Sequence, residues 1–251
     1  MSRVVVVTGA GTGIGRAIAA RLGAGAFVAC LGRRARLCEE TLELVRAAGG
    51  DGVALSMDVT DQESVAAAVA AIRAARDRID VLVNNAGVGG PNDMASEDDR
   101  WSTIIATNLD GTYRVTRAAL PCMPDGGRIL NIASVLGRFG VPGYTAYCAS
   151  KHGIVGLTRA LALELAPRRI TVNAVCPGWV ATDMAIDGMR AGAAARGIEL
   201  AAFERDAMTR VPIGRMLEPA EVAALCSYLA SDDAAGMTGQ ALDLNGGSFM
   251  G

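Results

Sequence analysis

The segment V4-V-V-V-T-G-A-G-T-G-I-G-R16 decides the fold of this chain, because an apolar run leads directly into a glycine-rich turn and then a helical pattern. Its glycines at 9, 13 and 15 follow G-x-x-x-G-x-G rather than G-x-G-x-x-G. Glycine permits the tight turn and lets backbone amides approach a pyrophosphate at the positive end of a helix. A flexible loop is the alternative interpretation, but the position between a first strand and a helix favours a dinucleotide site.

Six further apolar, β-branched runs follow this segment, separated by longer stretches of helical period. We expect strands in RVVVVT, AFVACLG, GVALSMDV, IDVLVNNA, GRILNIAS, ITVNAVCPG and ALDLNGG, and helices at 15–22, 35–48, 62–76, 98–122, 146–166 and 218–230. This alternation predicts an α/β fold: a single Rossmann-type domain over 1–251, with a doubly wound, parallel, seven-stranded sheet and helices on both faces.

The segment 183–212 interrupts this alternation. It is rich in alanine and methionine and has helical stretches but no strand pattern. It follows the sixth predicted strand, where an α/β sheet places its ligand crevice. The sequence therefore predicts a substrate lid over about 183–212.

Charge and hydropathy narrow the possible partners and location. The formal net charge is -2 and no long run of one sign occurs, so neither nucleic acid nor an anionic membrane is an expected partner. The first residues lack the pattern of a secretory signal, and no apolar stretch reaches the roughly 18 residues of a spanning helix. A cytoplasmic protein is expected.

Cysteine and histidine usage excludes several kinds of site. The six cysteines stand singly, mostly in apolar surroundings, and are expected to be reduced and mostly buried. His152 is the only histidine, so motifs that need two histidines are excluded and no metal site is expected. A Ser-His-Asp hydrolase would have to use His152, which we expect to be a packed or partly exposed helix residue.

Lys151 is the single lysine among 24 basic residues and lies four residues after Tyr147. Positions i and i+4 share a helix face, so the ammonium is expected close to the phenol. A free phenol titrates near pH ~10, and a nearby positive charge lowers that pKa, making Tyr147 a general acid or base. Unlike arginine, lysine can tune a phenol, bond a ribose and join a proton relay.

Other side chains surround this pair in the predicted fold. Tyr144 lies two turns from Lys151 and is expected to line the pocket. Ser134 ends the strand RILNIAS, where its hydroxyl could bond a substrate carbonyl, although an isolated serine there is usually a helix cap. Asn108 is predicted within a helix, where asparagine is a poor choice on propensity alone.

The end of the second predicted strand reads C-L-G32-R33-R34, with two arginines and no carboxylate. An acid at this place binds the ribose hydroxyls of NAD(H), whereas guanidinium groups suit a 2'-phosphate. We therefore predict NADP(H), with NAD(H) as the alternative. The alternative interpretation is that both arginines are simply solvent-exposed residues at the start of a helix. Thr12 also leaves the predicted phosphate site without a second basic residue on the glycine-rich turn.

Taken together, these motifs resemble the short-chain dehydrogenase/reductase family. They are T-G-x-x-x-G-I-G, N84-N-A-G87, Ser134 thirteen residues before Y-x-x-x-K, and Pro177-Gly178 followed by Thr182. The resemblance runs from residue 4 to about 247. The stretches LTRALALELAPRRITVNAVCPGWVATDMA, RVPIGRMLEPAEVA and TGQALDLNGG are most similar to β-ketoacyl-thioester and polyketide ketone reductases of that family.

The resemblance implies roles for particular residues. The catalytic tetrad would be Asn108, Ser134, Tyr147 and Lys151, with Asn108 anchoring a water that relays protons to Lys151. The cofactor would contact Gly9, Thr12, Gly13, Ile14, Gly15, Arg33, Arg34, Asp58, Val59, Asn85, Ala86, Gly87, Tyr147, Lys151, Pro177, Gly178, Val180 and Thr182. In that set Asp58 and Val59 would face the adenine, although Asp58 also suits a cap or turn, and Val180 with Thr182 would hold the nicotinamide carboxamide.

The implied activity is NADPH-dependent reduction of a ketone, a 3-oxoacyl thioester or a polyketide carbonyl, to a secondary alcohol, with Tyr147 as general acid. A dehydrogenase of a cyclic, steroid-like or small alcohol is the alternative. A non-catalytic NADP(H)-binding regulator and a purely structural assembly protein are weaker alternatives. The expected partners are a small ketone or alcohol, free or linked to a carrier protein or CoA, and further copies of the chain in a homotetramer formed through 98–122 and 146–166.

Overall fold

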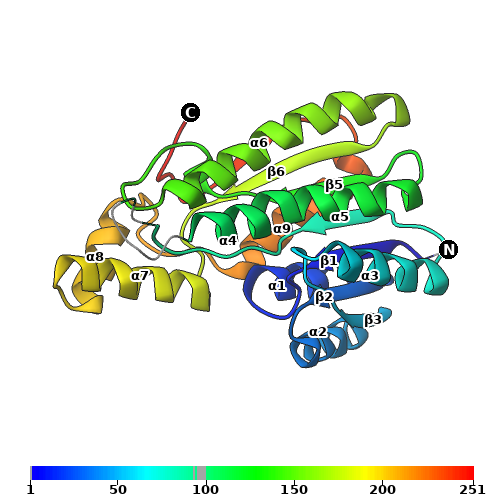
Figure 1. The fold of residues 1–251 in the computed structure, drawn as a ribbon, viewed down its shortest axis with the longest axis horizontal. Helices are drawn as coiled ribbons and strands as arrows, with labels where there is room; N and C mark the ends of the chain where they lie inside the picture. The colour runs from blue at the N-terminus through cyan, green and yellow to red at the C-terminus, as the bar shows by residue number, and fades with distance from the viewer. Residues whose placement is uncertain (1, 93, 95–99) are drawn as a thin grey trace.

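The fold is built on one parallel sheet with helices packed around it, as Figure 1 shows. The computed structural model describes residues 2–92, 94 and 100–251. Within them the seven strands have the order β3-β2-β1-β4-β5-β6-β7. The strands are β1 Val4–Thr8, β2 Phe27–Gly32, β3 Asp51–Ser56, β4 Val81–Asn84, β5 Arg128–Ile132, β6 Thr171–Pro177 and β7 Ala241–Leu244. The predicted parallel, doubly wound sheet is confirmed.

Helices cover both faces of the sheet because successive strand residues point to opposite sides. Val5 and Val7 of β1 pack in the core beneath α1, α2 and α9, while Val4 and Val6 pack beneath α3, α5 and α6. The helices are α1 Gly13–Leu22, α2 Ala35–Ala47, α3 Gln62–Ala75, α4 Trp101–Ile105, α5 Gly111–Ala119, α6 Thr145–Leu165, α7 Asp183–Arg196, α8 Leu200–Thr209 and α9 Pro219–Ala230. The strand β1 therefore contributes side chains to the hydrophobic cores on both faces of the sheet.

The strand order reverses at β1, whose residue Val6 pairs with Ala29 of β2 on one side and Leu82 of β4 on the other. Chain connections leave β1 and β4 in opposite directions, which opens a crevice at their carboxyl ends. The glycine-rich turn follows β1, and the segment Asn85–Gly87 follows β4. Both predicted cofactor segments thus meet at the reversal point.

The predicted helix over 98–122 is interrupted where the structure describes it, from residue 100 onward. Between α4 and α5 the residues Ala106–Asp110 form a π-helical stretch, and Leu120–Cys122 form a short 3-10 turn. Residues 98 and 99 lie outside the described residues. Single π turns inserted in α-helices are frequent at functional sites, and this one contains Asn108.

The predicted strand over 52–59 is shorter than expected, since β3 ends at Ser56. The Asp58 carboxylate accepts hydrogen bonds from the backbone amide and the hydroxyl of Thr60, at 2.9 and 2.8 Å. These bonds turn the chain toward α3 and end the strand.

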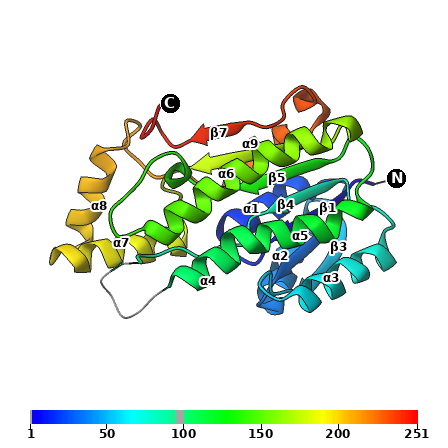
Figure 2. The same ribbon diagram turned by 45° about the horizontal axis from the view of Figure 1, so that its top comes forward.

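The segment 183–212 forms two helices, α7 and α8, joined through Gly197 at φ 63°. They project beyond the carboxyl ends of the strands at one end of the molecule, as Figures 1 and 2 both show. No residue of 183–212 lies in a strand, as the sequence predicted.

The six cysteines are free, and Cys30, Cys38, Cys176 and Cys226 are buried. The expectation of mostly buried thiols is confirmed. Among the described residues, no helix has both the length and the apolarity needed to cross a bilayer.

Candidate active site

The glycine-rich turn needs glycine for both conformation and space. Gly9 and Gly13 have φ values of 63° and 51°, in the left-handed region that side chains disfavour. A Cβ atom on Gly15 would lie 2.2 Å from the carbonyl oxygen of Gly9 and 2.4 Å from Nδ2 of Asn85. Asn85 Nδ2 in turn donates to the carbonyl oxygens of Thr8 and Gly9, at 2.9 and 3.2 Å. The turn therefore packs against the segment after β4 with no room for side chains.

The same turn is suited to bind a pyrophosphate. Thr12 is the N-cap of α1, but its side chain caps no helix amide, so the first amides of a ten-residue helix remain available. A Cβ atom on Gly13 would lie 3.1 Å from Cγ2 of Thr182, so Thr182 packs against the turn. The uncapped amides at the start of α1 fit the pyrophosphate of a dinucleotide.

Arg33 and Arg34 lie between the end of β2 and the start of α2, the place predicted for the adenosine ribose. Both are exposed, and neither forms a salt bridge with another described residue. Asp58 is near enough to Arg33 to interact with it electrostatically, but its hydrogen bonds from Thr60 have the larger effect in lowering the Asp58 pKa. Asp58 therefore acts at least as a turn residue, one of the interpretations left open above.

Asn108 is fully buried and uses every polar atom of its side chain. Oδ1 accepts from the backbone amide of Val88 at 2.8 Å, while Nδ2 donates to the carbonyl oxygen of Val88 at 3.0 Å and to Oγ of Ser150 at 3.1 Å. The side chain thus pairs with the Val88 peptide as a neighbouring strand would. It fixes the segment after β4 to α6.

Ser134 lies close enough to Tyr147 for its hydroxyl to lower the pKa of the phenol. Ser134 also caps a short 3-10 helix, accepting from the amide of Leu136 at 3.1 Å, so it is both a cap and a neighbour of the phenol. Burial raises the pKa of Tyr147 to about 12, and Ser134 offsets only part of that rise. The phenol is therefore protonated at neutral pH.

Lys151 is buried beside this pair, with Nζ donating to the carbonyl oxygen of Ile132 at 2.8 Å and lying 5.5 Å from the Tyr147 ring centroid. Burial lowers the pKa of Lys151 to about 8. The prediction of a lowered Tyr147 pKa is wrong in this structure, because desolvation of the phenol raises it. A phenol and an ammonium whose pKa values are both strongly shifted in one crevice identify a candidate catalytic site.

One wall of the site comes from the segment 183–212. A Cβ atom on Gly89 would lie 3.3 Å from Sδ of Met184 and 3.8 Å from Cε2 of Tyr147. Met184, in the first turn of α7, is therefore separated from the phenol ring by one glycine. Tyr144 is half-buried at the start of α6, and burial raises its pKa, as expected of a residue near a pocket.

The remaining predicted cofactor residues line the end of β6 and the chain beyond it. Pro177 ends β6, and a Cβ atom on Gly178 would lie 3.0 Å from Cα of Asn245. Val180 is buried, and Thr182 accepts from the amide of Ala185 at 3.4 Å as the N-cap of α7. The candidate carboxamide site and the segment 183–212 are thus continuous.

Several residues that shape the site were not among the predicted site residues. Thr8 accepts from the amides of Asn85 and Ala86, both at 2.9 Å, and Ser150 bonds Asn108. Met184 was part of the predicted lid but was not assigned a contact. Of these, only Thr8 carried a local signal, since it directly precedes the first glycine of the turn.

His152 is exposed, and its Nδ1 lies 2.9 Å from the carbonyl oxygen of Cys148 on the preceding helical turn. This agrees with a partly exposed helix residue. Within the part of the chain that the structure describes, no group of three or more His, Cys, Asp or Glu side chains could hold a metal ion.

Comparisons with known proteins agree with this geometry. The sequence model described as enoyl-(acyl carrier protein) reductase matches residues 9–248. A 3-oxoacyl-(acyl-carrier-protein) reductase FabG from Pseudomonas aeruginosa is 41% identical over 253 residues, covering 99% of this chain and 98% of the relative. A candidate ketoacyl reductase of the monensin polyketide synthase from Streptomyces virginiae is 44% identical over 254 residues, covering 98% and 97%.

Solved structures show the same similarity. The crystal structure of a variant of the actinorhodin polyketide ketoreductase with NADPH is 42% identical, with a TM-score of 0.93 over 98% of this chain and 97% of that one. A dehydrogenase/reductase from Sinorhizobium meliloti 1021 is 33% identical, with a TM-score of 0.89 over 100% and 96%. Together with the tetrad motifs, these matches place the chain in the short-chain dehydrogenase/reductase family of oxidoreductases.

Proposed function

We propose that this protein reduces a ketone to a secondary alcohol with NADPH, and that the ketone is a 3-oxoacyl thioester or a polyketide-type carbonyl. The observation that carries the proposal is the half-buried Tyr147 phenol, which lies beside Ser134 and near the buried Lys151 ammonium. A protonated phenol beside a hydroxyl suits a carbonyl oxygen that gains negative charge during reduction.

The bound cofactor supplies a hydride to the carbonyl carbon. Ser134 donates a hydrogen bond to the carbonyl oxygen, and Tyr147 transfers its phenolic proton to that oxygen as the C–H bond forms, leaving a phenolate. Lys151 stabilises the phenolate by its positive charge, and a proton from solvent restores the phenol. The reverse oxidation uses the same residues with Tyr147 as base.

Asn108 is proposed to support this chemistry by holding two segments of the site together. Both protons of its Nδ2 are donated, to Val88 and Ser150, and Oδ1 accepts one bond, from the Val88 amide. We propose that it keeps the segment after β4 and the catalytic helix α6 in register. A water that relays protons to Lys151 would be held by the second lone pair of Oδ1 or by the backbone of Asn108.

The proposed cofactor is NADP(H), with NAD(H) as the alternative. The pyrophosphate would lie on Gly9, Thr12, Gly13, Ile14 and Gly15, and the 2'-phosphate near Arg33 and Arg34. Two exposed guanidinium groups that form no salt bridge with another described residue favour the additional phosphate. The other proposed contacts are Asp58, Val59, Asn85, Ala86, Gly87, Tyr147, Lys151, Pro177, Gly178, Val180 and Thr182.

The helices α7 and α8 are proposed to form the substrate lid of this single domain. A hollow of about 440 Å³ lies between them and the segment 214–218, which leaves the lid only partly packed against the body. Met184 would contact the substrate close to Tyr147, so the lid sets which ketone enters. Oxidation of a cyclic or steroid-like alcohol is the second candidate function, since Met184 is adaptable and apolar.

The experiment that tests this function is NADPH oxidation by the purified protein with acetoacetyl-CoA, crotonyl-CoA and a bulky bicyclic ketone. Faster turnover of acetoacetyl-CoA supports the 3-oxoacyl proposal, and preference for the bicyclic ketone supports the cyclic alternative. Turnover of crotonyl-CoA alone would replace ketone reduction by enoyl reduction, which the matching family description names. NADPH binding without turnover of any of the three would favour the regulator.

A homotetramer and a cytoplasmic location are also proposed. Tyr113 of α5 and Leu163 of α6 are exposed apolar residues on the two helices expected to mediate assembly, and their burial in an oligomer would be favourable. Light scattering coupled to size-exclusion chromatography measures the oligomeric state. The free thiols agree with a reducing compartment.

A further inference from the structure

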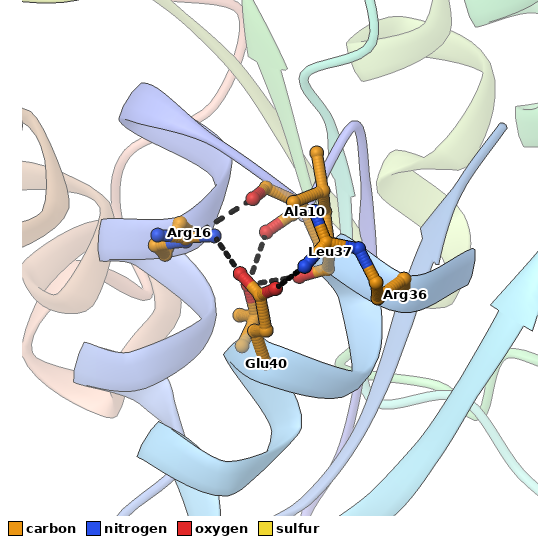
Figure 3. A network of polar contacts seen from close by, with 7 residues as sticks. Ala10, Arg16, Arg36, Leu37 and Glu40 are labelled. Carbon is orange, nitrogen blue, oxygen red and sulfur yellow. Dashed lines mark hydrogen bonds and ion pairs between the residues drawn. The ribbon is translucent and has the colours of Figure 1, made fainter. Parts of the chain in front are cut away.

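Arg16 links the glycine-rich turn to α2, as Figure 3 shows. Its Nε donates to the carbonyl oxygen of Gly11 at 3.1 Å, and its Nη2 lies 3.2 Å from Oε2 of Glu40 on α2. Its Nη1 has no protein partner among the described residues. The guanidinium is therefore held in place, and its Nη1 remains available as a hydrogen-bond donor.

Glu40 is shared between two arginines. Its other oxygen, Oε1, lies 2.8 Å from Nη1 of Arg36. Two guanidinium groups on one carboxylate leave the group of three with a net positive charge. Glu40 thus fixes the position of Arg16 without cancelling the positive potential beside the turn.

Arg16 is not the only attachment of the turn to α2. The buried hydroxyl of Thr41 donates to the carbonyl oxygen of Ala10 at 2.9 Å, and Asn85 holds Gly9. A Cβ atom on Gly11 would lie 2.9 Å from Cβ of Leu37, so backbone packing also joins the two elements. Because these other contacts already attach the turn to its neighbours, attachment of the turn does not explain why position 16 is an arginine.

The location of Arg16 suggests an electrostatic role. Arg33 and Arg34 directly precede α2, which packs on the turn through Leu37. Burial raises the pKa of the Cys38 thiol of α2, and Arg34 and Arg16 are both close enough to offset part of that rise, so the two charges lie in the same region. Thr12 supplies no charge on the turn itself. Arg16 is a cation next to Thr12, because its Nε donates to the carbonyl oxygen of Gly11.

We propose that Arg16 is a determinant of selectivity for NADP(H): its positive charge, held on the turn by Gly11 and Glu40, helps Arg33 and Arg34 attract the 2'-phosphate. This inference rests on the proposed use of NADP(H). Charges within about 8 Å interact appreciably at physiological salt, so Arg16 need not contact the phosphate directly.

The test is cofactor binding by isothermal titration calorimetry, with NADPH and NADH and without substrate. We expect Arg16→Gln to weaken NADPH binding by about fivefold and to change NADH binding by less than about twofold. Arg16→Lys should retain most of the NADPH affinity because it keeps the charge. The matched control is Arg46→Gln, which removes one charge from an exposed pair with Glu43 at the far end of α2 and should leave both affinities unchanged.

Glu40→Gln provides a second variant whose effect has the opposite sign. Neutralising the carboxylate raises the positive potential, so NADPH should bind at least as tightly as to the wild type. Raising the ionic strength from about 0.05 to about 0.5 M should reduce the difference between wild type and Arg16→Gln.

Equal weakening of NADPH and NADH binding by Arg16→Gln would overturn the proposal and leave Arg16 as a fastener of the turn. Unchanged NADPH binding, or a selective loss of NADPH binding in Glu40→Gln, would also overturn it. A wild-type protein that binds NADH as tightly as NADPH would refute the cofactor proposal itself. None of these results depends on whether the protein reduces a ketone.

Discussion

The Nζ atom of Lys151 lies 5.5 Å from the centroid of the Tyr147 ring, one helical turn further along α6. Its hydrogen bond goes to the carbonyl oxygen of Ile132, not to the phenol. The ammonium is thus held at a distance where it can stabilise a phenolate electrostatically without donating a hydrogen bond to the phenol. Tyr147 itself remains protonated at neutral pH, the state needed to donate a proton to a ketone.

Replacing Tyr147 with Phe removes the only proton donor that the proposed mechanism uses. We expect kcat for ketone reduction to fall by about 10²–10⁴-fold, the usual contribution of general acid catalysis, while the Kd for NADPH changes by less than about threefold. Steady-state kinetics and a cofactor titration measure the two effects. Tyr144→Phe is the matched control and should keep most of the activity; a Tyr147→Phe protein with full turnover would refute the assignment.

The pH dependence of ketone reduction should follow the titration of the Lys151 ammonium. Because its pKa is lowered to about 8, the ammonium is charged below that pH and becomes neutral as the pH rises through it. The phenol, with a pKa raised to about 12, stays protonated across this range. We therefore expect kcat/KM to be level near pH 6–7 and to decline above about pH 8. A profile that stays level to pH ~9.5 would contradict a role for Lys151 in its charged form.

Asn108→Ala should destabilise the protein as well as inactivate it. The change leaves the amide and carbonyl of Val88 without their partner and removes a fully buried side chain, at a cost of about 2–3 kcal/mol in the free energy of unfolding. Urea denaturation followed by circular dichroism measures this cost. Thr107→Ala, at a half-buried neighbour whose hydroxyl makes only an exposed bond to the Thr103 carbonyl, should change stability by less than about 0.5 kcal/mol. Equal stabilities of the two variants would show that the pairing with Val88 contributes nothing.

Two glycine substitutions should have effects of opposite sign. Gly15→Ala would bring a methyl group within 2.2 Å of the Gly9 carbonyl oxygen, so the turn must shift, with a loss of about 1–3 kcal/mol of stability and much weaker cofactor binding. Gly156→Ala, in the exposed interior of α6 with no atom within 4 Å of the new Cβ, should stabilise by about 0.5–1 kcal/mol. Thermal unfolding with and without NADPH distinguishes the two. A Gly15→Ala protein that NADPH stabilises as much as the wild type would be evidence against a pyrophosphate site on the turn.

The fold class and the positions of most elements could be predicted because their signals are local. The four valines of β1 and the glycines after them specify a buried strand and a tight turn from neighbouring residues alone. The spacing of Tyr147 and Lys151 predicted a shared helix face for the same reason. Predictions erred mainly at boundaries and in the helix containing Asn108, where a π-helical stretch has no local sequence signature.

The sequence by itself therefore determined an α/β chain of alternating strands and helices, with its nucleotide turn, paired arginines and Tyr-Lys pair. Only the tertiary structure decided how these groups are held, through contacts between residues distant in the chain: Asn108 with Val88, Lys151 with Ile132, and Arg16 with Glu40. It also decided that desolvation raises the pKa of Tyr147. The physical reason is that burial and hydrogen-bond partners depend on which segments pack together, and spacing along the chain does not report that packing.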